Sequence, residues 1–530
     1  MYPTPRSHRP LIMGRNGAVG ANHPMAAQAG LDILRQGGNA VDAAVATSLA
    51  LGVCEPMMSG LGGDGFYHVR MADGRAQVFN GSGPAPRAAT PERNRDGIAV
   101  TGPSSVSVPG SLAGIAAMHA AHGRLPFPRL VAPAIELARD GFAVTHGYRH
   151  FAAENEARLA ADKRSGKVFL GHGLAGLVVQ ENLARTLEEI AADGAESFYR
   201  GRLAVRLARG MKEVGVAITE ADLAEFEAQV QEPIGIAYRG FEIRQTPPNS
   251  TGFVLLEMLK IVERFDLKTL SPVERVHVLV EAKKLAFQDR ETYGTDPRLG
   301  TVPIELLLSD AHADRLAERI DLHRAASLAL EREAAEADTT YFCVIDRDGN
   351  AVSGIQSINS AFGSGVTAGD TGVLLNNRMA YWHLAEGHPN RLVPGKRVRH
   401  TMNAPMLLEG GKLWVVLGTP GGDNQVQVNL QVITAMLDFG ADPQTALELS
   451  RWSSSQAGQE ANWPHGGDGS LTIESDFGEE VLSGLEALGH DVKRVGHVEG
   501  PSAMQANRLI PNGVRVAASD TRRDGWAAAY

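Results

Sequence analysis

Cysteine and long apolar runs are both scarce in this chain of 530 residues. Only Cys54 and Cys343 occur, with no metal-ligand spacing between them, so we expect two buried thiols and no disulfide framework. No apolar run approaches the roughly 20 residues that span a bilayer. The start of the chain offers only residues 11–13, short of the roughly 7–15 apolar residues of a signal-peptide core. We therefore expect no membrane partner and a cytoplasmic location.

Clusters of basic residues are also missing. The net charge of −10 is spread along the chain, whereas a nucleic-acid partner would need grouped Lys and Arg to neutralise phosphates. With 43% hydrophobic residues, 21% charged residues and a mean hydropathy of −0.14, the composition is that of a globular protein. The expected partner is a small molecule. The length predicts two domains or one large multilayer α/β body.

The first two thirds of the sequence are predicted to be mainly helical. Two helices over 26–36 and 40–53 are joined by a tight turn, because Gly37-Gly38 ends the first and Asn39 caps the second. Apolar periodicity predicts further helices over 130–140, 180–192, 201–214, 253–265, 272–291, 304–332 and 424–439. Strands are expected over 372–375 and 413–418.

The character of the sequence changes abruptly at residue 338. An Ala/Glu/Arg-rich stretch gives way to a β-branched and aromatic run over 339–345, which returns over 351–358 through an Asp-Gly turn. A charged loop that leads into a buried strand is what a processing site requires. Thr339-Thr340 taken alone is more often structural, because β-branched residues suit strands.

Two other patterns do not indicate a ligand. Residues 60–65 fit the GxGxxG dinucleotide motif, but a helix precedes them and a strand follows, which is the reverse of the required context. Residues 346–350 look like the start of a calcium loop, yet the downstream Glu is absent and a hairpin turn accounts for them. No GxSxG, HExxH or Walker motif is present. We therefore expect neither a nucleotide nor a calcium ion.

An ordered series of motifs runs through nearly the whole chain. It comprises residues 37–44, 59–66, 106–110, 132–135, 141–142, 247–252, 286–290, 338–340, 356–359, 362–365, 376–377, 418–423 and 518–525. In this order the motifs resemble the gamma-glutamyltransferase (gamma-glutamyltranspeptidase) family. The resemblance implies a four-layer αββα sandwich of the N-terminal-nucleophile hydrolase fold and no metal or organic cofactor. It also implies self-cleavage between Asp338 and Thr339.

Cleavage would give a large subunit, 1–338, and a small subunit, 339–530, that form a heterodimer or a dimer of heterodimers. A threonine hydroxyl needs a base to act as a nucleophile. Once Thr339 is a chain terminus, its own α-amino group, with a pKa of about 7.7–8.0, can be that base. Before cleavage the same hydroxyl would attack the Asp338 carbonyl, so one oxygen serves both maturation and turnover.

The resemblance assigns roles to four further residues. Ser357 would position the freed amine, and Asn359 would lie in the same wall. Gly421 and Gly422 match the family's oxyanion hole, where backbone N–H groups meet developing negative charge and the lack of Cβ permits close approach. A Gly-Gly pair after Thr-Pro could also be only a turn.

The residues that hold a gamma-glutamyl group in the family are replaced here. Ser82 stands in place of the arginine that clamps the substrate α-carboxylate, and Tyr381 in place of the acid that holds the α-ammonium. His400-Thr401 replace a serine pair. Charge-assisted hydrogen bonds contribute about 1.5–3 kcal/mol each, so these losses weaken recognition of a gamma-glutamyl group.

The sequence adds groups suited to a carboxylate or carbonyl without a neighbouring ammonium. These are Arg378, Tyr381 and His400, with His383 as a further candidate, although Arg378 could instead pair with an acidic side chain elsewhere. In these features the chain resembles the family's acylase branch, which includes cephalosporin (glutaryl) acylases and oxamate amidohydrolase. The expected reaction is hydrolysis of an amide of a small, non-amino carboxylic acid. Two alternatives stay open: a gamma-glutamyl hydrolase or transferase acting on glutathione-like compounds, and an inactive binding homologue.

Overall fold

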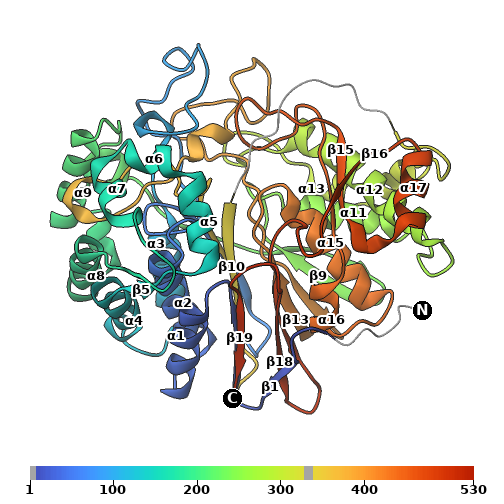
Figure 1. The fold of residues 1–530 in the computed structure, drawn as a ribbon, viewed down its shortest axis with the longest axis horizontal. Helices are drawn as coiled ribbons and strands as arrows, with labels where there is room; N and C mark the ends of the chain where they lie inside the picture. Colours follow the sequence, from blue (N-terminus) through green and yellow to red (C-terminus); the bar gives the residue numbers. More distant parts are fainter. Residues whose placement is uncertain (1–6, 327–337) are drawn as a thin grey trace.

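The computed structural model describes residues 7–326 and 338–530. Two seven-stranded sheets stack face to face and a layer of helices covers the outer face of each, so the predicted αββα sandwich is confirmed (Figure 1). Small additions are a three-stranded sheet of β14 (Trp452–Ser454), β15 (Ser470–Glu474) and β16 (Asp491–Val495), and a pair of β5 (Phe142–Ala143) and β6 (Leu177–Val178).

The first sheet carries the strand that follows the predicted processing site. In spatial order it contains β19 (Trp526–Ala529), β2 (Gly17–Ala21), β10 (Asp338–Asp346), β11 (Ala351–Asn359), β3 (Asp64–Arg70), β4 (Ala76–Gly81) and β7 (Gln229–Gln231). All of its pairings are antiparallel. Because β10 and β11 lie in the middle of the sheet, both of their faces are covered, which suits their runs of β-branched and aromatic residues.

The second sheet mixes strands from both ends of the chain. Its spatial order is β1 (Ile12–Gly14), β18 (Arg515–Ser519), β17 (Gln505–Leu509), β13 (Lys412–Gly418), β12 (Met406–Glu409), β9 (Phe241–Gln245) and β8 (Ile234–Tyr238). In each sheet, strands from before residue 338 pair with strands from after it. Cleavage at residue 338 would therefore leave two fragments that share both sheets.

The helices form two separate outer layers, visible at the left and right of Figure 1. On the side of the first sheet lie α1 (Pro24–Arg35), α2 (Ala40–Cys54), α3 (Ser111–His122), α4 (Phe127–Asp140), α5 (His146–Glu154), α6 (Glu156–Ala160), α7 (Lys163–Phe169), α8 (Glu181–Asp193), α9 (Arg202–Glu213) and α10 (Glu220–Ala224). On the side of the second lie α11 (Gly252–Val262), α12 (Pro272–Tyr293), α13 (Ile304–Leu307), α14 (Asp310–Ala317), α15 (Asn424–Leu437), α16 (Pro443–Glu448) and α17 (Glu479–Ala487).

Most of the predicted elements are confirmed, and two are wrong. The predicted helix over 304–332 is two short helices, α13 and α14, with a new cap at Ser309 between them; residues 327–332 lie outside the described residues. The predicted strand over 372–375 forms no ladder, because Gly372 turns the chain with a φ of 72° and only isolated bridges follow. Both cysteines are buried free thiols. Among the described residues, no helix combines the length and apolarity needed to cross a bilayer.

Candidate active site

Thr339 lies near the start of β10, in the middle of the first sheet. It is only 2% exposed. Asp338 pairs with Asn359 and Thr340 pairs with Gln356, so two residues of β11, at 357 and 358, face the single residue Thr339. This irregularity is a β-bulge, a feature that redirects side chains at the ends of strands. Thr339 therefore sits at the one point of the ladder where the pairing is interrupted.

Ser357 and Asp64 belong to the same face of the sheet as Thr339. Side chains alternate along a strand, so Thr339 points the same way as Tyr341, which packs between the two sheets. Ile355 pairs with Tyr341, and Ser357 follows it by two residues. Ser357 in turn lies directly opposite Asp64 of β3. The ends of β10, β11 and β3 thus bring three polar side chains to one edge of the inter-sheet space.

The glycine pair reaches this edge from the opposite sheet. Strand β13 ends at Gly418, where a Cβ would lie 2.3 Å from the Tyr341 ring, so this glycine permits close packing over β10. The chain then turns through Gly421 and Gly422, both at positive φ (114° and 54°), and enters α15. Backbone N–H groups at the start of a helix favour negative charge.

Arg378, Asp64 and His400 form one buried charged cluster. Asp64 Oδ2 accepts hydrogen bonds from Arg378 Nε at 3.1 Å and from His400 Nε2 at 3.3 Å, while its Oδ1 accepts from the Gly83 N–H at 2.8 Å. Arg378 Nη1 donates to Asn359 Oδ1 at 3.2 Å. Arg378 Nη2 has no hydrogen-bond partner among the described residues, although the side chain is only 1% exposed.

Tyr381 and Thr401 adjoin this cluster. The Tyr381 ring stacks under the Arg378 guanidinium at 4.4 Å, and its hydroxyl lies 3.1 Å from the Thr401 hydroxyl. Burial raises the pKa of Tyr381, so the phenol stays protonated at neutral pH. Asn359 has a φ of 83° and donates to Asn462 Oδ1 at 2.8 Å. Neutral hydroxyl and amide groups thus surround the Arg378 guanidinium.

Ser82 occupies a separate, fully hydrogen-bonded position. Its hydroxyl donates to Asn80 Oδ1 at 2.7 Å and accepts from Asn249 Nδ2 at 3.0 Å. The guanidinium of Arg397 reaches the same hydroxyl at 3.5 Å. The structure connects Ser82 to the cluster through two neighbours: the Gly83 N–H binds Asp64, and the Asn249 carbonyl accepts a hydrogen bond from the His400 N–H at 2.8 Å.

Burial and mutual charge set the ionisation of the cluster. Burial opposes ionisation of Asp64, but the hydrogen bond from His400 and the charge of Arg378 outweigh it and lower the pKa of this carboxyl. Burial, and then the charge of Arg378, lower the pKa of His400 to about 4 despite its bond to Asp64. Since His400 Nδ1 accepts from the Met402 N–H, the neutral ring donates through Nε2. At neutral pH the cluster holds one anion, one cation and a neutral imidazole.

These shifts predict a loss of stability in mild acid. An unfolded histidine titrates near pH 6.5, so between pH 6.5 and pH 4 the unfolded chain binds a proton that His400 does not, and the free energy of unfolding falls as the pH drops. Asp64 adds a further loss as the pH falls through its lowered folded pKa. His400→Gln should remove up to about 3 kcal/mol of this dependence. Urea unfolding between pH 7.5 and 4 measures this dependence, with the uncleavable Thr339→Ala chain compared with the same chain carrying His400→Gln. Parallel plots of the free energy of unfolding against pH for these two proteins would contradict the assignment of the dependence to His400.

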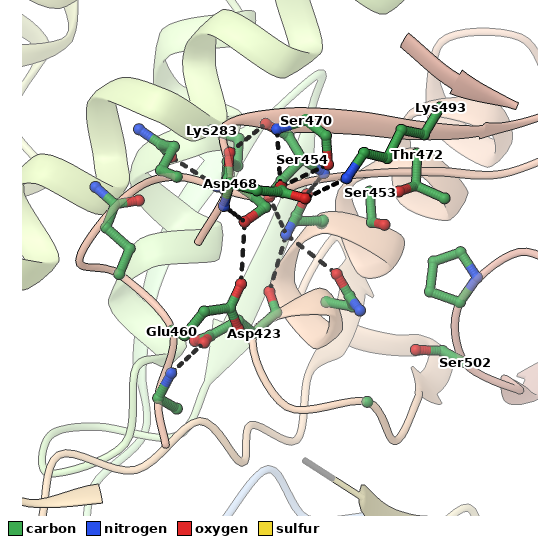
Figure 2. A pocket seen from close by; sticks show the side chains of 18 of the residues that line it. Lys283, Asp423, Ser453, Ser454, Glu460, Asp468, Ser470, Thr472, Lys493 and Ser502 are labelled. Atoms are coloured by element: carbon green, nitrogen blue, oxygen red, sulfur yellow. Dashed lines mark hydrogen bonds and ion pairs between the residues drawn. The ribbon is translucent and has the colours of Figure 1, made fainter. Parts of the chain in front are cut away.

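A polar cavity of about 570 Å³ opens next to Gly421. Figure 2 shows Asp423 and Glu460 on one wall and the pair of Asp468 and Lys493 on another. Ser502 lies close to Gly421, because a Cβ on that glycine would meet the Ser502 Oγ at 2.1 Å. The cavity therefore reaches the glycine pair from a side that Arg378 does not line.

Three groups of described residues place imidazole and carboxylate atoms close enough to share a metal ion. They are His277, Glu281 and His490; Glu291, His383 and His388; and Glu257, Asp289 and His312. Glu291 is already paired with Arg290 and Arg399. Thr339, Ser357 and the residues of the Arg378 cluster belong to none of the three groups.

Sequence reasoning missed two residues of the site. Asp64 stands inside the glycine-rich segment that fits a nucleotide motif, and the signal was its place at the start of a strand between glycines. Asn462, which bonds Asn359, lies in a segment without periodicity and gave no signal. Of the predicted residues, Asn359, Arg378, Tyr381, His400 and Thr401 come together around Asp64.

A four-layer αββα sandwich with a buried threonine at the second position of its central strand β10 is the architecture of the N-terminal-nucleophile hydrolases. The model of the gamma-glutamyltranspeptidase family matches residues 26–530. The chain belongs to this family, and it is an enzyme of the hydrolase and acylase kind that the family contains.

Similar proteins include both hydrolases and acylases. A glutathione hydrolase-like YwrD proenzyme of Bacillus subtilis is 37% identical, with 97% of this chain and 99% of that protein covered. An acylase ACY 1 proenzyme of a Pseudomonas species is also 37% identical, over 97% of this chain and 94% of that protein. The crystal structure of cephalosporin acylase from Bacillus halodurans superposes with a TM-score of 0.91 at 34% identity, covering 100% of this chain and 98% of the other.

Proposed function

We propose that the chain is a precursor that cleaves itself between Asp338 and Thr339 and then acts as an N-terminal-threonine amidohydrolase. The fragments 1–338 and 339–530 would remain together as a heterodimer, because strands of both lie in each sheet. Relatives described as proenzymes support this proposal. A small-molecule amide is the substrate, and no cofactor takes part.

The reaction uses one nucleophile and its own amine. The α-amino group of Thr339 takes the hydroxyl proton while Oγ attacks the amide carbon, and the N–H groups of Gly421 and Gly422 stabilise the oxyanion. The C–N bond breaks, the amine leaves with the proton, and an acyl-Thr339 ester forms. Water then attacks the ester with the same amine as base, which releases the carboxylic acid and regenerates Thr339. Ser357, adjacent to Thr339 in the ladder, would orient the amine.

The acyl group is a small carboxylic acid without an α-ammonium. The observation that carries this proposal is the guanidinium of Arg378, buried beside Asn359 with its Nη2 unpartnered among the described residues. Such a group suits a carboxylate or carbonyl. Both oxygens of Asp64 are occupied by protein donors, so an ammonium would find no free counter-ion there. Tyr381 and Thr401 add neutral hydroxyls.

Two substrates that differ only by an ammonium test this choice. Glutaryl-p-nitroanilide should have a kcat/KM at least about 10-fold above that of gamma-glutamyl-p-nitroanilide, because the ammonium would be buried beside Arg378 without a partner. Arg378→Met should lower kcat/KM for the glutaryl substrate by about 10-fold to 100-fold. Release of p-nitroaniline measures both, on protein whose cleavage has been checked by electrophoresis.

Butyryl-p-nitroanilide, which lacks the distal carboxylate, is the control. Its hydrolysis should change little in Arg378→Met, whereas an equal loss on both substrates would mean that Arg378 only supports Asp64. A faster reaction with the gamma-glutamyl substrate would favour the alternative, a hydrolase or transferase of glutathione-like compounds. The relative YwrD is described as glutathione hydrolase-like, which is the specific reason to test that alternative.

A further inference from the structure

The cavity beside Gly421 is separated from the Arg378 cluster by a short wall. The wall consists of residues 459–462: Glu460 and Ala461 line the cavity, and the next residue, Asn462, accepts a hydrogen bond from Asn359 on the other side. The Ala461 N–H is tied to Asp423 Oδ2 at 2.8 Å, which fixes the wall against the glycine loop. Asn359, Arg378, Tyr381 and His400 are not among the residues that line the cavity.

This arrangement gives the two halves of an amide different places. When the substrate oxygen lies against the glycine pair, the acyl chain and the leaving nitrogen must diverge from the carbonyl carbon. If the acyl chain extends toward Arg378, the amine extends across Gly421 into the cavity. The lining there is mostly polar, with the hydroxyls of Ser453, Ser454, Ser455, Ser470, Thr472 and Ser502.

Lys283 is a basic side chain that lines this cavity. It projects from α12, is 1% exposed, and forms no ion pair with a described carboxylate. Its Nζ donates to Gln456 Oε1 at 2.6 Å and lies 4.1 Å from the centre of the Phe287 ring. An ammonium has three donors, so further acceptors can be bound. Burial and the neighbouring Arg290 lower the pKa of Lys283, which an incoming anion would reverse.

Three of the acids that line the cavity have partners or are weak anions. Asp423 is paired with Arg290, and Asp468 with Lys493. Glu460 accepts a hydrogen bond from Ser455, and burial followed by the charge of Asp423 raises its pKa to about 7. A protonated Glu460 would not repel an anion bound at Lys283.

We propose that this cavity is the leaving-group subsite and that Lys283 binds a carboxylate carried by the amine half of the substrate. The inference rests on the amidohydrolase function proposed above and adds the class of amine released: an amine with an acid group, such as an amino acid or an aminobenzoic acid. Lys283 is a specificity-determining residue in this scheme and takes no part in bond breaking.

Two anilides with the same acyl group test the inference. Wild-type enzyme should hydrolyse glutaryl-3-carboxyanilide with a higher kcat/KM than glutaryl anilide. Lys283→Met should lower kcat/KM for the carboxyanilide by about 10-fold to 100-fold, the range for one charge-assisted hydrogen bond, and leave the plain anilide unchanged. Unchanged activity on the plain anilide also shows that the variant is folded. Product amines are measured by chromatography.

Lys493→Met is the matched control, because Lys493 lines the same cavity but is paired with Asp468. It should leave the ratio of the two substrates unchanged. The inference would be overturned, with the amidohydrolase function intact, if wild type and Lys283→Met each hydrolysed the two anilides with equal kcat/KM. A preference of wild type for glutaryl-3-(aminomethyl)anilide would overturn it as well. If wild type hydrolyses none of the three, the proposed function itself fails.

Discussion

Thr339→Ala is expected to abolish both self-cleavage and amide hydrolysis, the largest effect of any single change in the chain. The substitution removes the hydroxyl oxygen that the mechanism uses as the nucleophile of the protein, first on the Asp338 carbonyl and then on the substrate. Wild type should run as two fragments split before Thr339, and the variant as one chain of 56.4 kDa. Intact mass and denaturing electrophoresis distinguish them.

Thr340→Ala is the matched control for that experiment. Thr340 is the next residue on the strand, points to the opposite face, and its buried hydroxyl has no hydrogen-bond partner among the described residues. This variant should still cleave, and Thr339→Ser should retain part of the activity. Cleavage of Thr339→Ala would rule out Thr339 as the nucleophile. An uncut wild-type chain would make a binding homologue the leading hypothesis.

Local signals were sufficient to predict much of the fold. Asn39 caps α2 as expected, and the structure adds a capping box with Asp42; the helices α4, α8, α9, α12 and α15 lie within a few residues of their predicted bounds. The strand pair β10 and β11 follows from β-branched residues around an Asp-Gly turn. In each case the deciding contacts lie within a few residues of one another, so periodicity and capping report them directly.

The site was less predictable because its contacts join distant parts of the chain. Arg378 and Asp64 are 314 positions apart, and whether the guanidinium meets a carboxylate depends on the packing of β3 against the segment after β11. Arg378 does pair with an acidic side chain, because its Nε binds Asp64, and the binding of a substrate carboxylate by Nη2 stays a prediction. Lys283 stands in a helix whose sequence is rich in good helix formers, and nothing local indicates that its side chain enters a cavity.

The error at residues 304–332 has a similar origin. Apolar periodicity continues through this stretch, but Pro303 and Ser309 each begin a new helix, and the break at Ser309 lets α14 pack against α11. Lys260 of α11 and Arg264, just after this helix, bind Asp310 at the start of α14. Tertiary contacts therefore favour a break where propensity alone favours one long helix.

Gly421→Ala is expected to lower kcat by about 10²-fold to 10³-fold, the usual cost of losing one oxyanion donor. Gly421 has a φ of 114°, where an L-residue is strained, and a new Cβ would lie 2.1 Å from the Ser502 Oγ. The loop must shift, which moves the N–H groups at 421 and 422 away from the oxyanion. Self-cleavage should slow too, because its tetrahedral intermediate would use the same donors. Stopped-assay kinetics on purified, cleaved protein give kcat.

Gly440→Ala separates backbone strain from catalysis. Gly440 also has a positive φ, 74°, but a Cβ at this position would have no atom within 4 Å, and the residue follows the far end of α15. Its substitution should cost about 1–3 kcal/mol of stability with kcat retained. Equal kcat values for the two variants would show that the glycine pair is only a turn.

Adding Ser502→Ala to Gly421→Ala removes the clash with the Ser502 Oγ and leaves the strained φ at residue 421. The recovery of kcat should be partial, because the position of the N–H groups depends on both the clash and the φ.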